Sequence, residues 1–218
     1  MNVLHICGNP KPISESASKQ LAASFFAKLA ELNPDIDVTN VDLYQNPPPY
    51  VSNDALRYFW NPIKDPAYKI TGTEEKASTY ARNQGALLKE ADVLVLTMPM
   101  WCNSMPAIMK AWLDQVLSPG IVFSWGPDGV SIMHHLRKVI LLVASGAVFK
   151  EEDPDDGITP VLRSIFSFIG VTDIAVAWAD GQDVIHHHDS SERKTMAMEA
   201  AQELAEEVAE MVAEPVEQ

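Results

Sequence analysis

The sequence predicts an α/β fold, a doubly wound five-stranded parallel sheet with helices on both faces. Short apolar runs alternate along the chain with segments whose apolar residues recur at three and four positions, the periods of strand and helix. The run KVILLVAS at 138–145 is apolar throughout, as expected for a strand covered on both faces. No repeat, linker or composition shift divides the 218 residues. We therefore expect 1–218 to form a single domain.

The first half of the chain contains two expected strands and one expected helix. Residues 3–7 (VLHIC) form an apolar run that ends at the glycine and prolines of GNPKP. A helix face follows and ends before Pro34, with apolar residues Leu21, Phe25, Leu29 and Leu32. Residues 36–44 alternate and predict the second strand. Residues 45–72 are too long for a simple connection, so they form either a functional loop or short structure of their own.

The second half of the chain predicts three more strands and four helices. Thr71 and Glu74 have the spacing of a capping box, and Ser104 can cap a helix whose first turn contains Pro106. The strands are expected at 92–100, 138–145 and 171–178, and the helices from Thr71 to Leu88, from Ser104 through Val116, from Thr159 to Gly170, and along the apolar stripe Ala197, Ala201, Leu204, Val208 and Met211.

Composition argues against several classes of protein. The formal charge of -14 would repel nucleic acid, and the basic residues are scattered. Apolar runs such as 139–149 are shorter than the roughly 20 residues of a membrane span. The N-terminal residues lack the pattern of a signal peptide, so we expect a cytoplasmic protein. Cys7 and Cys102 form no CxxC and are expected to be reduced thiols.

Three serines follow the first strand, at the start of the first helix. Ser14, Ser16 and Ser18 would place hydroxyl donors beside the free amides of a helix N-terminus, which together can hold a phosphate. Taken alone, the three serines favour a role as helix caps only, over a phosphate site. The sequence contains neither G-x-G-x-x-G nor G-x-x-x-x-G-K-[ST], so a monophosphate is a better ligand than a dinucleotide or a nucleoside triphosphate.

Two further strand ends carry candidate binding residues. After the third strand, PMWCNSMP presents Trp101 and the backbone amides of residues 102–104, against which a flat heteroaromatic ring could stack and pair. Trp101 could instead be an ordinary core residue. After the fourth strand, Ser145 and Gly146 form a turn that lets backbone approach a ligand, although a tight turn without a ligand would look similar.

At these residues the chain resembles the flavodoxin-like, FMN-dependent NAD(P)H:quinone oxidoreductases that include the bacterial azoreductases. The resemblance rests on the Ser-x-Ser turn, on PMWCNSMPAIMKAWLDQV and on TPVLRSIFSFIGVTDIAVAWADG. It implies a flavodoxin-like fold that binds FMN. The FMN phosphate would lie on Asn9, Ser16, Ala17 and Ser18, and the ring on Met100, Trp101, Cys102, Asn103, Ala144, Ser145, Gly146 and Ala147.

The resemblance also implies a reaction. NADH or NADPH would pass a hydride to the flavin and leave, and a quinone or azo compound would then take two electrons at the same place. No catalytic side chain and no metal are expected. Family members are generally homodimers whose partner subunit completes the pocket. The expected substrate wall consists of Trp60, Phe123, Trp125 and Phe149.

The chain departs from the family pattern at two places. Cys102-Asn103 stands where many azoreductases have Asn-Phe, and residues 144–147 lack the arginine of a Ser/Thr-Arg-Gly-Gly turn. The second difference removes a positive charge near the ring and leaves the redox potential and substrate range open.

The sequence leaves three alternative functions open. The first is a flavodoxin-type electron carrier, against which the chain length and the aromatic 45–72 segment argue. The second is a hydrolase using Cys102, for which no motif supplies a histidine or aspartate partner. The third is a metal site at residues 186–188 with His134 and His135, where a solvated loop is the better account because adjacent histidines project in different directions.

Overall fold

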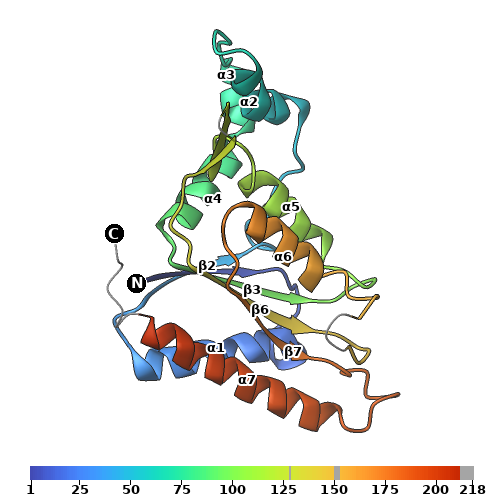
Figure 1. Ribbon diagram of the computed structural model, residues 1–218. Coiled ribbons are helices and arrows are strands. Elements are labelled where there is room, and N and C mark those ends of the chain that lie inside the picture. Colours follow the sequence, from blue (N-terminus) through green and yellow to red (C-terminus); the bar gives the residue numbers. More distant parts are fainter. Residues whose placement is uncertain (128, 150–152, 212–218) are drawn as a thin grey trace.

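A five-stranded parallel sheet runs through the middle of the molecule (Figure 1). The computed structural model describes residues 1–127, 129–149 and 153–211. The sheet has the order β2-β1-β3-β6-β7, which confirms the predicted fold and places the chain reversal between β1 and β3. Its strands are β1 (Asn2–Cys7), β2 (Asp37–Asp42), β3 (Val93–Pro99), β6 (Lys138–Ala144) and β7 (Ile174–Ala179).

Helices cover both faces of the sheet (Figure 1). One face carries α1 (Ala17–Leu32) and α7 (Ser190–Glu210). The other carries α4 (Thr79–Glu90), α5 (Ala107–Val116) and α6 (Thr159–Phe168). Side chains alternate across a strand, so successive residues of β3 enter opposite cores and are fully buried. This two-sided burial explains why the central strands are almost entirely apolar.

A smaller group of elements extends beyond the α4 and α5 side of the sheet (Figure 1). It contains α2 (Asn53–Lys64), α3 (Gly72–Ala77) and an antiparallel hairpin of β4 (Phe123–Gly126) and β5 (Gly129–Ile132). The 45–72 segment therefore has short structure of its own. The hairpin escaped sequence analysis because each strand has four residues and most of them are not buried, so no apolar run marks it.

The expected helix from Thr71 to Leu88 is divided in two. Its capping box is confirmed. The Glu74 amide donates a hydrogen bond to Thr71 Oγ1 at 3.3 Å, and the Thr71 amide donates one to the Glu74 carboxylate at 2.9 Å. The division falls at Ser78, whose hydroxyl donates to the Glu75 carbonyl at 2.9 Å. Such side-chain bonds to the backbone compete with a continuous helix, and they leave no mark in apolar periodicity.

Two other boundaries differ from the prediction. Ser104 does not cap α5, which starts after Pro106, because its hydroxyl donates to the Gly157 carbonyl at 3.2 Å. The fifth strand begins at Ile174 rather than at residue 171, because the Val171 amide still donates to Phe166 in the turn that ends α6. A 3-10 turn at Ile13–Glu15 precedes α1. No helix in the part of the chain that the structure describes is long and apolar enough to cross a membrane.

Candidate functional site

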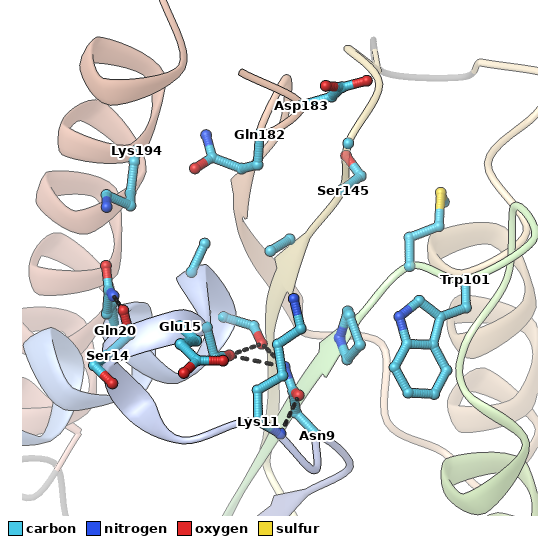
Figure 2. A pocket seen from close by; sticks show the side chains of 17 residues that line it. Asn9, Lys11, Ser14, Glu15, Gln20, Trp101, Ser145, Gln182, Asp183 and Lys194 are labelled. Carbon is cyan, nitrogen blue, oxygen red and sulfur yellow. Dashed lines mark hydrogen bonds between the residues drawn. The ribbon is translucent and has the colours of Figure 1, made fainter. Parts of the chain in front are cut away.

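A cavity of about 450 Å³ lies at the carboxyl ends of β1, β3 and β6 (Figure 2). Its walls come from the start of α1, the β3–α5 connection, the turn after β6 and the first residues of α7. Ligand sites of open α/β sheets lie in this position, and the volume is within the range of small-molecule pockets.

Nine of the twelve residues predicted to bind the cofactor line this cavity. They are Asn9, Ser16, Ala17, Ser18, Met100, Trp101, Ala144, Ser145 and Gly146. The other three, Cys102, Asn103 and Ala147, lie in the same two turns but do not line the cavity.

The four aromatic residues expected to form a substrate wall do not line the cavity of this chain. Phe123 is buried against Phe168, with ring centroids 5.4 Å apart. Trp125 stacks on Phe168 with ring centroids 6.0 Å apart, and Phe149 stacks on Trp178 at 5.2 Å. Trp60 lies on α2 with 38% of its surface exposed.

Several cavity residues were missed from the sequence: Lys11, Glu15, Gln20, Pro99, Gln182, Asp183 and Lys194. Glu15 and Pro99 are next to predicted residues, and Lys11 and Gln20 are two positions from one. Gln182 and Asp183 follow β7, and their position beyond the carboxyl end of a predicted strand was the available signal. Lys194 lies on α7, and no local pattern indicated it. Lys11 and Lys194 bring positive charge to the cavity of a chain whose net charge is -14.

A buried polar cluster forms the end of the cavity beside α1. Asn9 Nδ2 donates to Ser16 Oγ at 2.7 Å and to Ser18 Oγ at 3.0 Å, and all three residues are at most 3% exposed. The Lys11 amide donates to Asn9 Oδ1 at 3.0 Å and so fixes the orientation of the Asn9 amide.

The Asn9 contacts determine what the two serines can offer a ligand. Each hydroxyl accepts a hydrogen bond from Asn9 and keeps its own hydrogen to donate. The Ser16 and Ser18 oxygens are 3.3 Å apart, so at most one of these hydrogens is used between them. The first amides of α1 have no partner within the helix. Hydroxyls, amides and the helix dipole together are the groups that an anion-binding site requires.

The turn after β3 reverses within two residues. Trp101 and Ser104 exchange backbone hydrogen bonds of 2.9 and 3.0 Å, and between them Cys102 and Asn103 both have positive φ, at 50° and 57°. Segment 153–157 holds this turn, since the Gly157 amide donates to the Asn103 carbonyl at 2.9 Å. Trp101 is 43% exposed at the cavity, an open surface against which a flat ring can stack.

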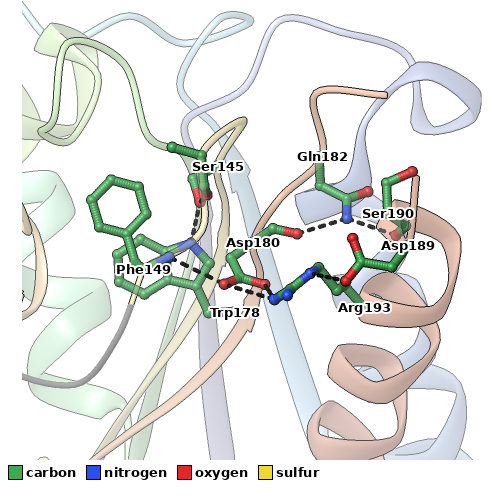
Figure 3. A network of polar contacts seen from close by, with 9 residues as sticks. Ser145, Phe149, Trp178, Asp180, Gln182, Asp189, Ser190 and Arg193 are labelled. Atoms are coloured by element: carbon green, nitrogen blue, oxygen red, sulfur yellow. Dashed lines mark hydrogen bonds and ion pairs between the residues drawn. The ribbon is translucent and has the colours of Figure 1, made fainter. Parts of the chain in front are cut away.

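The turn after β6 is fixed by a polar network (Figure 3). Ser145 Oγ accepts the Trp178 indole N–H at 2.8 Å and donates to the Ala147 carbonyl at 2.8 Å. The Ser145 hydroxyl is therefore committed to the protein, and the ligand-facing groups of this turn belong to the backbone. The Phe149 amide donates to the Asp180 carboxylate at 3.1 Å.

The thiols and histidines show no arrangement for nucleophilic or metal chemistry. Cys7 is buried, which raises its pKa, and Cys102 is exposed. Within the described ranges no hydrogen bond joins Cys102 to a histidine or carboxylate, as a thiol hydrolase would need. The same residues contain no group of three or more metal-ligating side chains in position to hold an ion.

The residues present fit an FMN. The buried Asn9, Ser16 and Ser18 cluster provides donors for a phosphate, with Lys11 near it on the cavity wall (Figure 2). Trp101 and the turn at 144–146 line the cavity further from α1, where a ring could lie between them. Such a cavity binds one end of its ligand by charge and the other by stacking and backbone pairing.

Comparison with known proteins identifies relatives across most of the chain. An FMN-dependent NADH:quinone oxidoreductase from Beijerinckia indica is 33% identical over 175 residues, covering 78% of this chain and 83% of the relative. A protein of the same name from Gluconacetobacter diazotrophicus is 31% identical over 205 residues, covering 92% and 96%. The crystal structure of an azoreductase from Bacillus anthracis str. Sterne superposes with a TM-score of 0.82 at 26% identity, covering 94% and 98%.

The family profile described as "Flavodoxin-like fold" matches residues 1–207, which contain every element of the central sheet and all the lining residues of the cavity. The extent of this match and the similarity to curated relatives agree with the strand order and with the position of the cavity. The chain therefore belongs to the flavodoxin-like family that includes the FMN-dependent NADH:quinone oxidoreductases.

Proposed function

We infer that this chain is an FMN-dependent NADH oxidoreductase that reduces quinones or azo compounds. The observation that carries this inference is the buried Asn9, Ser16 and Ser18 cluster at the N-terminus of α1, which provides phosphate donors at the end of a cavity bordered by Trp101. The curated relatives named FMN-dependent NADH:quinone oxidoreductase support it.

Bound FMN would supply the redox chemistry, taking two electrons as a hydride from NADH and returning them to an acceptor after NAD⁺ has left. The residues of the chain bind and orient. We propose that all twelve predicted cofactor residues contact FMN: those lining the cavity, and Cys102, Asn103 and Ala147 through backbone amides. Because one open cavity serves both partners in turn, the kinetics should be ping-pong.

The overall reaction requires no acidic side chain in the cavity. A quinone gains the two electrons together with two protons, one from the NADH hydride and one from solvent. The cavity of this chain is open enough to admit water, and neutral backbone donors can orient the acceptor oxygen. We propose NADH as the donor because the curated relatives are named for it.

We further propose a homodimer, supported by an exposed apolar surface. This surface, called the aromatic patch here, consists of Trp125, Ile132, Met133 and Phe168, whose exposed fractions range from 38% to 49%. It adjoins an apolar hollow of about 210 Å³ between α2 and β4, lined by Tyr58 and Phe59 among others. Contiguous exposed apolar surface of this kind favours a protein partner. Cytoplasmic location stays a prediction, which cell fractionation would test.

The visible spectrum of the purified protein tests the function. We expect FMN, identified by mass after release, bleaching of its absorption by NADH without oxygen, and recovery on adding a benzoquinone. An electron carrier would bind FMN but would not be reduced by NADH at a catalytic rate. A protein that neither contains nor takes up FMN would contradict the proposed function.

A further inference from the structure

The turn after β6 is held on one side by the loop after β7. Three consecutive turn carbonyls accept hydrogen bonds from three consecutive loop amides: Ala147 from Gly181 at 2.9 Å, Ser145 from Gln182 at 2.9 Å, and Gly146 from Asp183 at 3.1 Å. The carbonyls of 145–147 therefore all point toward the 181–183 loop.

The geometry of the peptide bond fixes where the amides of the same turn point. In a trans peptide the N–H lies opposite the C=O, and the described residues contain no cis peptide. The amides of Gly146, Ala147 and Val148 therefore point away from the 181–183 loop. None of the three donates a hydrogen bond to another residue that the structure describes. Gly146 lines the cavity, and the amides of Ala147 and Val148 continue from it as a row of donors with no acceptor among the described residues.

An ion pair anchors the loop and the turn together (Figure 3). Asp180 Oδ2 accepts the Phe149 amide at 3.1 Å, and Arg193 Nη1 donates to both Asp180 oxygens at 3.1 and 3.3 Å. Gln182 Nε2 also donates to the Asp180 carbonyl, at 2.9 Å. Asp180 thus connects β7, the 144–149 turn and the first turn of α7.

Arg193 has a second acidic partner, Asp189, which is more exposed than Asp180. Its Nε donates to Asp189 at 2.8 Å, but the Asp189 side chain is 48% exposed, against 15% for Asp180. The hydrogen bond to Asp180 is the largest cause that raises the pKa of Arg193. Asp180 is therefore the inner partner that reaches the turn, and Asp189 is an outer partner that does not contact it.

We propose that Asp180 and Arg193 are positioning residues that hold the 146–148 amides as a donor row for the electron-rich edge of the cofactor ring. The proposal rests on the FMN function inferred above. Residues 144–147 lack a charged group that favours negative charge on the reduced ring. The donor row takes this role, since preoriented backbone donors stabilise an anion in the way that a cation does. The backbone amides would contact the ring directly, and the Asp180–Arg193 ion pair would act on the ring only by positioning those amides.

The test compares Asp180→Asn with Asp189→Asn in the full chain. Each variant removes one carboxylate from Arg193, but only the first touches the turn. The measurement is the affinity for oxidised and for dithionite-reduced FMN, with the midpoint potential as a check. For Asp180→Asn we expect the ratio of reduced to oxidised affinity to fall about tenfold, a potential about 30 mV lower for two electrons. Asp189→Asn should keep the wild-type ratio.

Thermal unfolding of the FMN-free proteins separates positioning from stability. A lower melting temperature of Asp180→Asn with an unchanged affinity ratio would overturn the proposal, because a purely structural ion pair predicts that result. If Asp180→Asn does not fold, Arg193→Lys keeps the charge but loses the forked contact, and a smaller shift in the same direction is expected. An unchanged ratio there would also overturn it. If the wild-type chain bound no FMN, the proposed function would fail instead.

Discussion

At the scale of single residues, Ser16 has two roles that can be measured separately. Its Oγ accepts a hydrogen bond from the Lys19 amide at 3.2 Å as the N-cap of α1, and it also belongs to the buried cluster of Asn9, Ser16 and Ser18. Ser16→Ala should cost about 1 kcal/mol of unfolding free energy and should also weaken FMN binding, since one hydroxyl donor is lost. Denaturant unfolding of the FMN-free protein and fluorescence titration with FMN measure the two effects.

The chain offers a matched control for this change. Ser52 caps α2 in the same way, accepting the Ala55 amide at 3.2 Å, but lies outside the cavity. Ser52→Ala should lose a similar stability, about 1 kcal/mol, and keep its FMN affinity. Equal FMN affinities for the two variants would show that Ser16 is only a helix cap, the alternative that the sequence left open.

His5 gives the fold a dependence on pH. Its ring nitrogens form hydrogen bonds with Asn40 Oδ1 at 2.8 Å and with Thr97 Oγ1 at 2.9 Å. Burial lowers the pKa of His5 from 6.5 to about 4. Between these pH values His5 is protonated in the unfolded chain and neutral in the folded chain. The free energy of unfolding therefore falls as pH falls. From this group alone the loss from pH 8 to pH 5 is about 2 kcal/mol.

Urea unfolding at pH 8 and pH 5 measures this contribution. In His5→Gln the pH-dependent loss should be smaller than in the wild type by about 2 kcal/mol, because the titrating group is gone. His188→Gln removes an exposed histidine and should keep the wild-type loss. If His5→Gln also keeps it, the ring is not held neutral in the folded chain.

The residues that sequence analysis found and those it missed differ in a physical way. Ser16 and Ser18 stand at the start of the first helix, so a local pattern predicts that they meet there, whereas Asn9 was indicated only by the family resemblance. Lys194 reaches the same cavity from a helix far along the chain, and no local pattern contains that information. The family resemblance places Phe149 in a substrate wall, whereas its stacking on Trp178 depends on the path of the turn.

At the scale of elements, Gly157 joins the segment before α6 to the turn after β3. A Cβ at this position would lie 2.2 Å from the Asn103 carbonyl oxygen, which is backbone and cannot rotate away. Gly157→Ala should therefore displace the Trp101–Ser104 turn, cost about 1–3 kcal/mol of stability and weaken FMN binding. Calorimetry and FMN titration test both parts of this prediction.

Gly72, the first residue of α3, provides the control for that substitution. A Cβ there meets no atom within 4 Å, and alanine favours a helix more than glycine does. Gly72→Ala should raise stability by about 0.5–1 kcal/mol and leave FMN binding unchanged. A Gly157→Ala protein with wild-type stability and FMN affinity would contradict the prediction, because the 153–157 segment would then move away from the turn without cost.

The elements that sequence predicted well are those buried by the sheet itself. β6 is buried throughout and β3 is buried as far as Met98, so their apolar composition alone marks them. The β4–β5 hairpin and the break at Ser78 depend on cross-strand pairing and on one side-chain hydrogen bond, neither of which changes the apolar pattern. Gly157 and Asp180, which hold the turns after β3 and β6, likewise act through contacts between distant segments.

At the scale of the whole molecule, the aromatic patch and α7 lie on opposite sides of the sheet (Figure 1). If the patch joins two copies, Trp125→Asp should place a charge in the interface and weaken the dimer at least about 30-fold, since buried tryptophans are strong interface contributors. Met196→Asp changes a side chain that is 61% exposed on α7 and should leave the dimer intact.

Light scattering across a dilution series, with and without FMN, measures this effect. The wild type and Met196→Asp should have twice the 24.0 kDa mass of one chain, and Trp125→Asp should approach the mass of one chain on dilution. FMN should bind more weakly to the separated subunits if the partner completes the pocket, since the expected aromatic wall is absent from the cavity of one chain. A wild type that stays at 24.0 kDa at every concentration would exclude the homodimer, and FMN would then be held by one chain alone.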